Sequence, residues 1–208
     1  MSMPFYVSPE QVMADKAEFA RKGIARGKSI VALEHQGGIL LMAENATSLS
    51  KVGEIYDRLA YAGVGKFSEF DQLRKVGVRY ADTTGYAYSR EDVRGRSLAN
   101  AFSQVIGEVF TREIKPLELE IIVAEVGDDR YEDHKNNCLY RIKYDGFISD
   151  HHGFVAIGGN VEEVESVLKN DYREGMPAGE AARLGQRALS AGAERSEPLD
   201  ASSLEAVS

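Results

Sequence analysis

The sequence contains one cysteine, Cys138, among its 208 residues, so an intrachain disulfide is impossible. This composition fits a reducing cytosol, where thiols stay reduced. No apolar run approaches the roughly 20 residues that a membrane-spanning helix needs. The opening stretch, MSMPFYV, lacks the basic and long apolar regions of a secretory signal. These absences predict a cytoplasmic protein without a membrane segment.

Positive charge is also scarce. The chain has 25 Lys and Arg against 33 Asp and Glu, which gives a formal net charge of -8. This balance argues against nucleic acid as a partner. The one basic cluster, Arg21-Lys22-Arg26-Lys28, is most simply a solvated helix face. With 43% hydrophobic and 28% charged residues, the chain has the composition of a soluble globular protein with a sizeable core.

Motifs for metal or nucleotide binding are weak or incomplete. Asp150-His151-His152, with His134 as a third candidate, could suggest a metal site, but adjacent histidines point in different directions and no Glu-x-x-His spacing supports them. Gly158-Gly159-Asn160 lacks the Lys-Ser/Thr pair of a phosphate-binding loop, so close packing of a strand against a helix explains it better. The acidic loop 127–133 lacks EF-hand spacing. We therefore expect no metal and no cofactor.

The clearest feature that is present is a capped helix directly in front of a strand. Ser8-Pro9-Glu10-Gln11 combines an S-x-x-Q capping box with proline at the first helical position. Apolar residues then recur at helical spacing as far as Ile24, and Gly27 ends the helix. The β-forming run Ser29–Leu33 follows at once. Such a helix controls what the N-terminal end of the strand can do.

The rest of the chain alternates between strand and helix patterns. Leu119–Val126 is a nearly continuous apolar run, which indicates a strand covered on both faces. We predict strands over 29–34, 39–44, 55–62, 119–126, 139–144, from 147, 154–157 and from 204; helices over 67–78, 90–113, 161–172 and 177–191; and connections over 45–50, 82–88, 127–137 and 193–203. Two antiparallel sheets packed face to face, with helices outside, would bury all these apolar faces.

Six segments of the chain are distinctive: EFARKGIARGKSIVAL (18–33), AENATSLSKVGEIYDRLAYAGVGKFSEFDQLR (43–74), ADTTGYAYSREDVRGRSLANAFSQVIGEVFTRE (81–113), LEIIVAEV (119–126), LYRIKYDGFI (139–148) and FVAIGGN (154–160). In this order they resemble proteasome α-subunits, those of actinobacteria in particular. The resemblance runs from Met1 to about Leu189. It implies an α+β fold, the four-layer α-β-β-α sandwich of the N-terminal-nucleophile hydrolases with an extra N-terminal helix.

The nucleophile of that hydrolase class is missing. Catalytic proteasome subunits use a free N-terminal threonine, whose hydroxyl attacks and whose α-amino group is the base. Here Gly27-Lys28-Ser29 occupies the start of the first core strand, and no Gly-Thr pair occurs in the chain. We expect Ser29 to be structural and the chain to be a non-catalytic subunit. The alternatives are an independent amidohydrolase activated by cleavage before Ser29, and a monomeric binding module.

The resemblance implies a role in assembly and access. An α-subunit forms a homo-heptameric ring at each end of a 28-subunit barrel with the proteolytic β-subunit, to which the helix from Phe67 onward would bind. The ring admits protein substrates and docks activators. The resemblance implies two kinds of activator: a ring ATPase that delivers proteins tagged with the prokaryotic ubiquitin-like protein, and ATP-independent activators.

The resemblance also divides the chain into a gating segment, 1–9, and a single α-type domain, 10–208. The gate residues would be Ser2, Met3, Pro4, Phe5, Tyr6, Val7, Ser8 and Pro9. The tyrosine-aspartate-arginine leader of archaeal subunits is not found there, since Tyr56-Asp57-Arg58 is internal, so archaeal gating residues cannot be transferred. The family's usual completed strand and final helix would follow Val207, close to where this sequence ends.

Lys51 and Glu18 are the candidate activator-binding residues. Lys51, in SLSKVGEIYDR, matches the α-subunit lysine in the pocket between neighbouring subunits, where it pairs with the C-terminal carboxylate of an activator's tail. An ammonium group on a flexible stem suits a mobile carboxylate. Glu18 matches a helix glutamate near that pocket. For both residues, an ordinary solvated side chain is the alternative.

Overall fold

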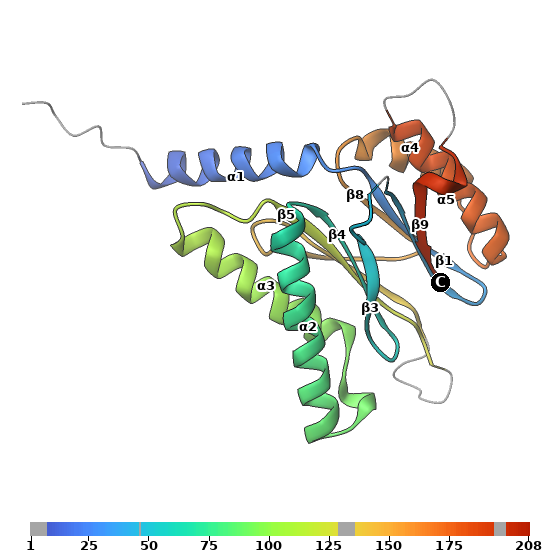
Figure 1. The fold of residues 1–208 in the computed structure, drawn as a ribbon, viewed down its shortest axis with the longest axis horizontal. Coiled ribbons are helices and arrows are strands. Elements are labelled where there is room, and N and C mark those ends of the chain that lie inside the picture. Colours follow the sequence, from blue (N-terminus) through green and yellow to red (C-terminus); the bar gives the residue numbers. More distant parts are fainter. Residues whose placement is uncertain (1–7, 46, 129–135, 194–198) are drawn as a thin grey trace, which may run out of the picture.

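Two antiparallel sheets packed face to face form the centre of the molecule (Figure 1). The computed structural model describes residues 8–45, 47–128, 136–193 and 199–208. One sheet has the strand order β8-β1-β2-β9 and the other the order β3-β4-β5-β6-β7. The strands are β1 (Ile30–His35), β2 (Gly38–Glu44), β3 (Val52–Tyr56), β4 (Leu59–Gly65), β5 (Leu119–Glu125), β6 (Cys138–Ile142), β7 (Ile148–His151), β8 (Phe154–Ile157) and β9 (Leu204–Val207).

Two helices cover the outer face of each sheet. The helices α4 (Val161–Asp171) and α5 (Ala178–Gly192) pack on the sheet of β1, and α2 (Phe67–Ala87) and α3 (Gly95–Arg112) pack on the sheet of β5. The predicted four-layer α-β-β-α sandwich, the fold of the N-terminal-nucleophile hydrolases, is therefore confirmed. Among the described helices, none combines the length and apolar character needed to cross a membrane.

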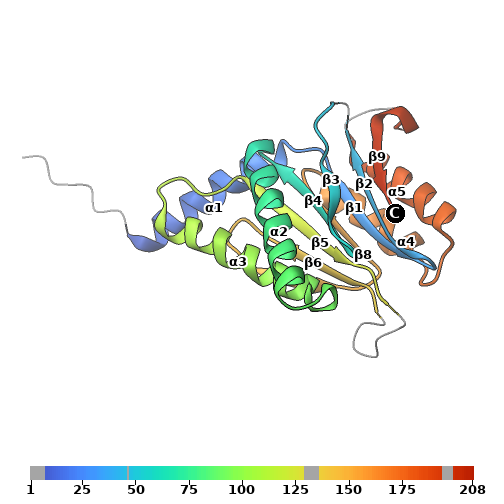
Figure 2. The ribbon, with the colours of Figure 1, turned by 60° about the horizontal axis from the view of Figure 1, so that its bottom comes forward.

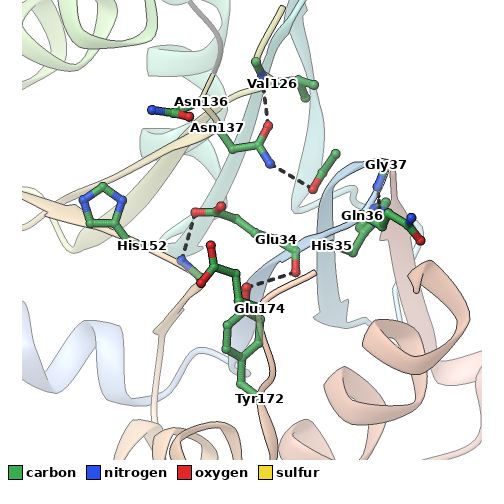
Figure 3. A pocket seen from close by; sticks show the side chains of 13 residues that line it. Glu34, His35, Gln36, Gly37, Val126, Asn136, Asn137, His152, Tyr172 and Glu174 are labelled. Carbon is green, nitrogen blue, oxygen red and sulfur yellow. Dashed lines mark hydrogen bonds between the residues drawn. The ribbon is translucent and has the colours of Figure 1, made fainter. Parts of the chain in front are cut away.

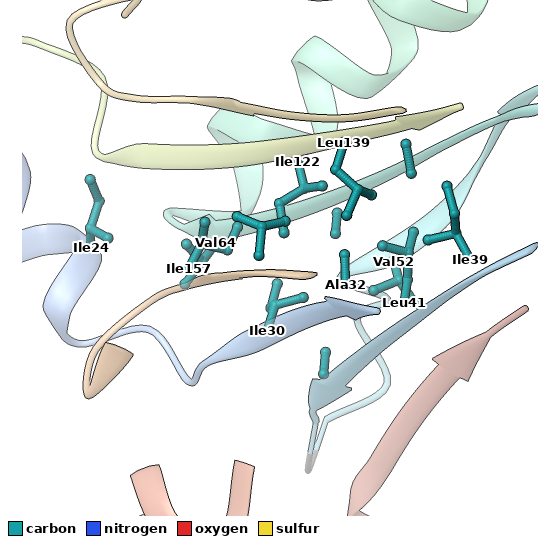
Figure 4. Close-up of a cluster of buried hydrophobic side chains, with 14 of the residues drawn as sticks. Ile24, Ile30, Ala32, Ile39, Leu41, Val52, Val64, Ile122, Leu139 and Ile157 are labelled. Carbon is teal, nitrogen blue, oxygen red and sulfur yellow. The ribbon is translucent and has the colours of Figure 1, made fainter. Parts of the chain in front are cut away.

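Alternating side chains along the strands separate the apolar layers. In β1, Ile30 and Ala32 face the other sheet, whereas Val31 and Leu33 face α4 and α5. All seven residues of β5 are buried, which confirms a strand covered on both faces. Figure 4 shows side chains from both sheets meeting in the inter-sheet core, among them Ile30, Leu41, Ile122, Leu139 and Ile157.

Helix α1 (Pro9–Ala25) lies outside the four layers. Figure 2 shows it running along one end of the sandwich, with its N-terminal end directed away from the sheets. The predicted N-cap is confirmed, because the Ser8 hydroxyl accepts a hydrogen bond from the backbone N–H of Gln11 at 3.2 Å. The Gln11 half of the predicted capping box differs, since the Gln11 side-chain amide donates to the Asp15 Oδ1 at 2.7 Å. Only the C-terminal half is buried, through Ala20 and Ile24. The N-terminal part of the predicted apolar face is not buried, since Phe19 is 46% exposed.

Residues 55–62 were predicted as one strand, and the structure corrects this. They belong to a hairpin, in which β3 and β4 pair antiparallel and Tyr56 lies opposite Leu59. The two residues of the turn, Asp57 and Arg58, include no glycine, so the usual signal for a two-residue turn is missing from the sequence.

Both helices that pack on the sheet of β5 also differ from their predicted bounds. α2 continues through the predicted connection 82–88 as far as Ala87, because Ala81 still packs into the core and Gly85 lies against the Tyr56 ring. The predicted helix 90–113 is interrupted: a short 3-10 turn, Arg90–Asp92, precedes α3, which begins only at Gly95. The buried carboxylate of Glu125 accepts the Gly95 N–H at 2.8 Å and fixes that start.

Candidate functional site

The junction between α1 and β1 occupies the place of a catalytic N-terminus. Ser29 is buried, with 6% of its surface exposed, and its carbonyl accepts the Glu44 N–H at 3.3 Å. The Gly159 N–H donates to the Gly27 carbonyl at 3.1 Å. A Cβ on Gly158, which has a φ of +118°, would lie 2.8 Å from the Ser29 Cα. Backbone therefore packs closely on backbone here, as expected for the pair Gly158-Gly159, and the Ser29 nitrogen is an internal amide.

Lys51 lies between β2 and β3, and its side chain is half-buried. Its Nζ donates a hydrogen bond to the Glu44 carbonyl oxygen at 2.8 Å. The Glu44 carboxylate is itself buried and lies 3.5 Å from the Lys28 Nζ. Burial lowers the pKa of Lys51, and the carboxylates of Glu44 and Glu205 oppose that shift. The ammonium group is thus held at the sheet edge beside other charges, rather than extending freely into solvent.

Glu18 is exposed on α1. Its Oε1 lies 2.6 Å from the Lys22 Nζ, one helical turn further on, and the hydrogen bond and charge of Lys22 lower the pKa of the Glu18 carboxyl. In the described part of the chain, no hydrogen bond or ion pair joins Glu18 to Lys51.

The predicted gate residues lie mostly outside the described residues. This applies to Ser2, Met3, Pro4, Phe5, Tyr6 and Val7. The last two, Ser8 and Pro9, are the N-cap and the first residue of α1.

The weaker candidates have structural partners or fall outside the described ranges. His134 and most of the acidic loop 127–133 are outside those ranges. Asp150 pairs with Arg96, and His151 shares a hydrogen bond of 2.9 Å with the Ser149 hydroxyl. Among the residues that the structure describes, no three His, Cys, Asp or Glu side chains are grouped to hold a metal ion.

A polar pocket of about 680 Å³ at the β1–β2 turn was not predicted from the sequence (Figure 3). Two of its polar side chains, Asn137 and Glu34, make structural contacts. The Asn137 amide accepts from the Gly127 N–H at 2.9 Å and donates to the Gly38 carbonyl at 3.3 Å, which links the two sheets. Glu34 accepts the Gly153 N–H at 2.9 Å. These contacts join loops at one end of the sandwich.

The sequence also did not reveal the residues around Lys51. The Lys51 backbone N–H donates to the Glu205 Oε2 at 3.0 Å, across 154 positions of sequence. Such a contact has no signature in local spacing, and only the pairing of β9 with β2 creates it.

The fold and the closed α1–β1 junction define a class, an N-terminal-nucleophile hydrolase sandwich whose nucleophile position is internal to the chain. The sequence model of the proteasome subunit family matches residues 24–205. The chain therefore belongs to the proteasome subunit family.

Similarity to individual proteins gives the subunit type. The chain is 54% identical over 192 residues to the proteasome subunit alpha of Xylanimonas cellulosilytica, an alignment that covers 92% of this chain and 77% of the relative. It is 52% identical over 200 residues to that of Acidothermus cellulolyticus, covering 95% and 84%. It is 51% identical over 210 residues to that of Mycobacterium avium, covering 99% and 81%. Within its family, the chain is an α-type subunit.

Proposed function

We propose that this chain is the non-catalytic α-subunit of a bacterial 20S proteasome core, working in the cytoplasm. Seven copies form each outer ring, and two such rings enclose the rings of the β-subunit, where proteolysis takes place. The observation that carries this proposal is the continuous backbone from α1 into β1. The amide of Ser29 is buried against Gly158, so Ser29 in the folded chain carries no free α-amino group, which catalysis in this fold requires at that position.

The second part of the proposal is control of access. The segment 1–9 gates the axial pore through which protein substrates reach the β-rings, and residues 10–208 form the ring-building domain. The position of α1 supports this, because the N-terminal end of the helix is directed away from the sheets (Figure 1).

The third part is activator docking at Lys51, with Glu18 of a neighbouring subunit close to the same pocket. The ammonium group of Lys51 has three N–H donors, and its hydrogen bond within the described chain uses one of them, toward the Glu44 carbonyl. The remaining donors suit the terminal carboxylate of an activator tail, either that of the ring ATPase or that of an ATP-independent activator.

Contact with the β-subunit is assigned to the helix from Phe67 onward, α2. Two aromatic side chains support this assignment at the C-terminal end of the helix. Tyr86 is 95% exposed and Tyr88 is 79% exposed. Exposed tyrosines close together are typical of protein interfaces, because the ring is apolar and the hydroxyl stays hydrated.

The intact mass of the purified chain, together with a peptide-hydrolysis assay, tests the proposal against its alternative. We expect a chain whose N-terminus precedes α1 and which hydrolyses no peptide alone, whereas the same chain co-purified with the β-subunit hydrolyses peptides. The control is the chain with Ser29→Ala, which should give an equally active core. A mature chain starting at Ser29, with activity lost in Ser29→Ala, would instead establish the amidohydrolase.

A further inference from the structure

The carboxylate of Glu205 binds the turn that carries Lys51. Glu205 lies on β9, which pairs with the end of β2 so that Glu205 is opposite Ala43. Its Oε2 accepts from the Asn45 Nδ2 at 2.8 Å and from the Lys51 backbone N–H at 3.0 Å, and its Oε1 accepts from the Ser50 hydroxyl. One side chain thus holds three residues of the connection between β2 and β3.

These contacts suit an ionised carboxylate. Burial raises the pKa of Glu205, but hydrogen bonds from the Lys51 N–H, Ser50 and Asn45 outweigh it, and the net shift is downward. Hydrogen bonds to a charged acceptor are roughly twice as strong as those between neutral groups. The contact is therefore fully formed at neutral pH and stabilises the folded state there. It weakens as the pH falls through the lowered pKa.

Lys51 is consequently fixed at both ends. Its backbone is held by Glu205, from the sheet edge, and its Nζ is held by the Glu44 carbonyl at 2.8 Å. A lysine side chain normally has several free rotatable bonds, and ordering it on binding costs conformational entropy. A turn that is already ordered removes part of this cost, so a carboxylate ligand meets the ammonium group in place.

We propose that Glu205 is a positioning residue, which holds Asn45, Ser50 and Lys51 so that Lys51 presents its ammonium group to the terminal carboxylate of a docking peptide. This inference rests on the proposed docking function of Lys51. Glu205 does not itself touch the peptide. Its role is carried by two acceptor oxygens that receive three donors, so glutamine, which keeps one acceptor oxygen and no charge, should retain only part of it.

The test uses the assembled core of this chain and its β-subunit, carrying Glu205→Ala, Glu205→Gln or Lys51→Ala. The probe is a synthetic peptide of the ring ATPase's C-terminal residues, with a free or an amidated C-terminus. The half-maximal concentration and the maximal stimulation of peptide hydrolysis are measured separately. Hydrogen exchange at the Lys51 amide reports the turn without any activator. The matched control is Glu54→Ala, which removes an exposed carboxylate from the adjacent strand β3.

We expect Glu205→Ala to raise the half-maximal concentration of the free-carboxylate peptide about tenfold, to leave the maximal stimulation unchanged and to accelerate exchange at the Lys51 amide. Glu205→Gln should raise the half-maximal concentration by no more than about threefold. Glu54→Ala should change neither the half-maximal concentration nor the exchange rate at the Lys51 amide. If Glu205→Ala prevents assembly, Ser50→Ala removes one of the same hydrogen bonds from the turn and should shift both readouts in the same direction.

Two results would overturn the inference in distinguishable ways. If Lys51→Ala abolishes stimulation while Glu205→Ala leaves the half-maximal concentration unchanged, Lys51 docks the peptide and Glu205 does not position it. If Lys51→Ala also leaves stimulation unchanged, the docking function of Lys51 is wrong, and the role of Glu205 is wrong with it.

Discussion

Replacing Lys51 with alanine should abolish activator-stimulated degradation by the assembled core while basal peptide hydrolysis stays unchanged. The ammonium group is half-buried and held beside Glu44, so its charge reaches an incoming carboxylate with little screening from solvent. Truncating one partner of such a pair costs at least about 2 kcal/mol of binding free energy, or roughly a 30-fold loss of affinity. Degradation of a tagged protein by the core with its ring ATPase measures the effect.

Lys169→Ala is the matched control for this prediction. Lys169 is an exposed lysine on α4 that pairs with Glu165 at 2.8 Å, so its removal deletes a surface charge without changing the β2–β3 turn. The control should degrade tagged protein at the original rate. Equal stimulated rates for Lys51→Ala and Lys169→Ala would show that Lys51 does not dock an activator.

Glu125→Ala should lower the free energy of unfolding by about 3 kcal/mol. Glu125 is the last residue of β5 and is 2% exposed. Its Oε1 accepts from the Arg94 Nε at 3.0 Å, and its Oε2 accepts from the Gly95 N–H at 2.8 Å. The substitution leaves a buried N–H at the start of α3 without this acceptor. Denaturant unfolding at a fixed protein concentration measures the change.

Two further variants calibrate the Glu125 prediction. Glu125→Gln keeps an acceptor oxygen and should lose less stability than Glu125→Ala. Glu108→Ala, on the exposed face of α3, should stay within about 0.5 kcal/mol of the original protein. If the denaturant midpoint of Glu125→Ala matched that of Glu108→Ala, the Glu125 carboxylate would not be needed to start α3 at Gly95.

The sequence predicted the parts of the fold that depend on local patterns. The N-cap at Ser8 and the seven buried residues of β5 both appear where the local motif and the apolar run indicated. What it could not predict depends on contacts between distant elements. The Asp57-Arg58 turn works without glycine because β4 is held by β5 on its other side. The start of α3 at Gly95 is set by Glu125, 30 residues away along the chain.

The candidate site shows the same division. Lys51 was found through its surrounding motif, and its role remains a proposal. Its environment could not be predicted, since Glu205 reaches the turn only when β9 adds to the edge of the sheet beside β2. Nothing in the sequence around Glu205 distinguishes it from the rest of the 33 acidic residues in the chain.

Native mass spectrometry of this chain, alone and co-expressed with its β-subunit, tests the central claim most directly. The account predicts a 28-subunit particle in the co-expressed sample, containing this chain with its N-terminus uncleaved. A monomer in both samples would contradict the ring-subunit account and indicate a separate binding module. A chain that starts at Ser29 would contradict it as well, because the closed junction between α1 and β1 would then belong only to an uncleaved precursor.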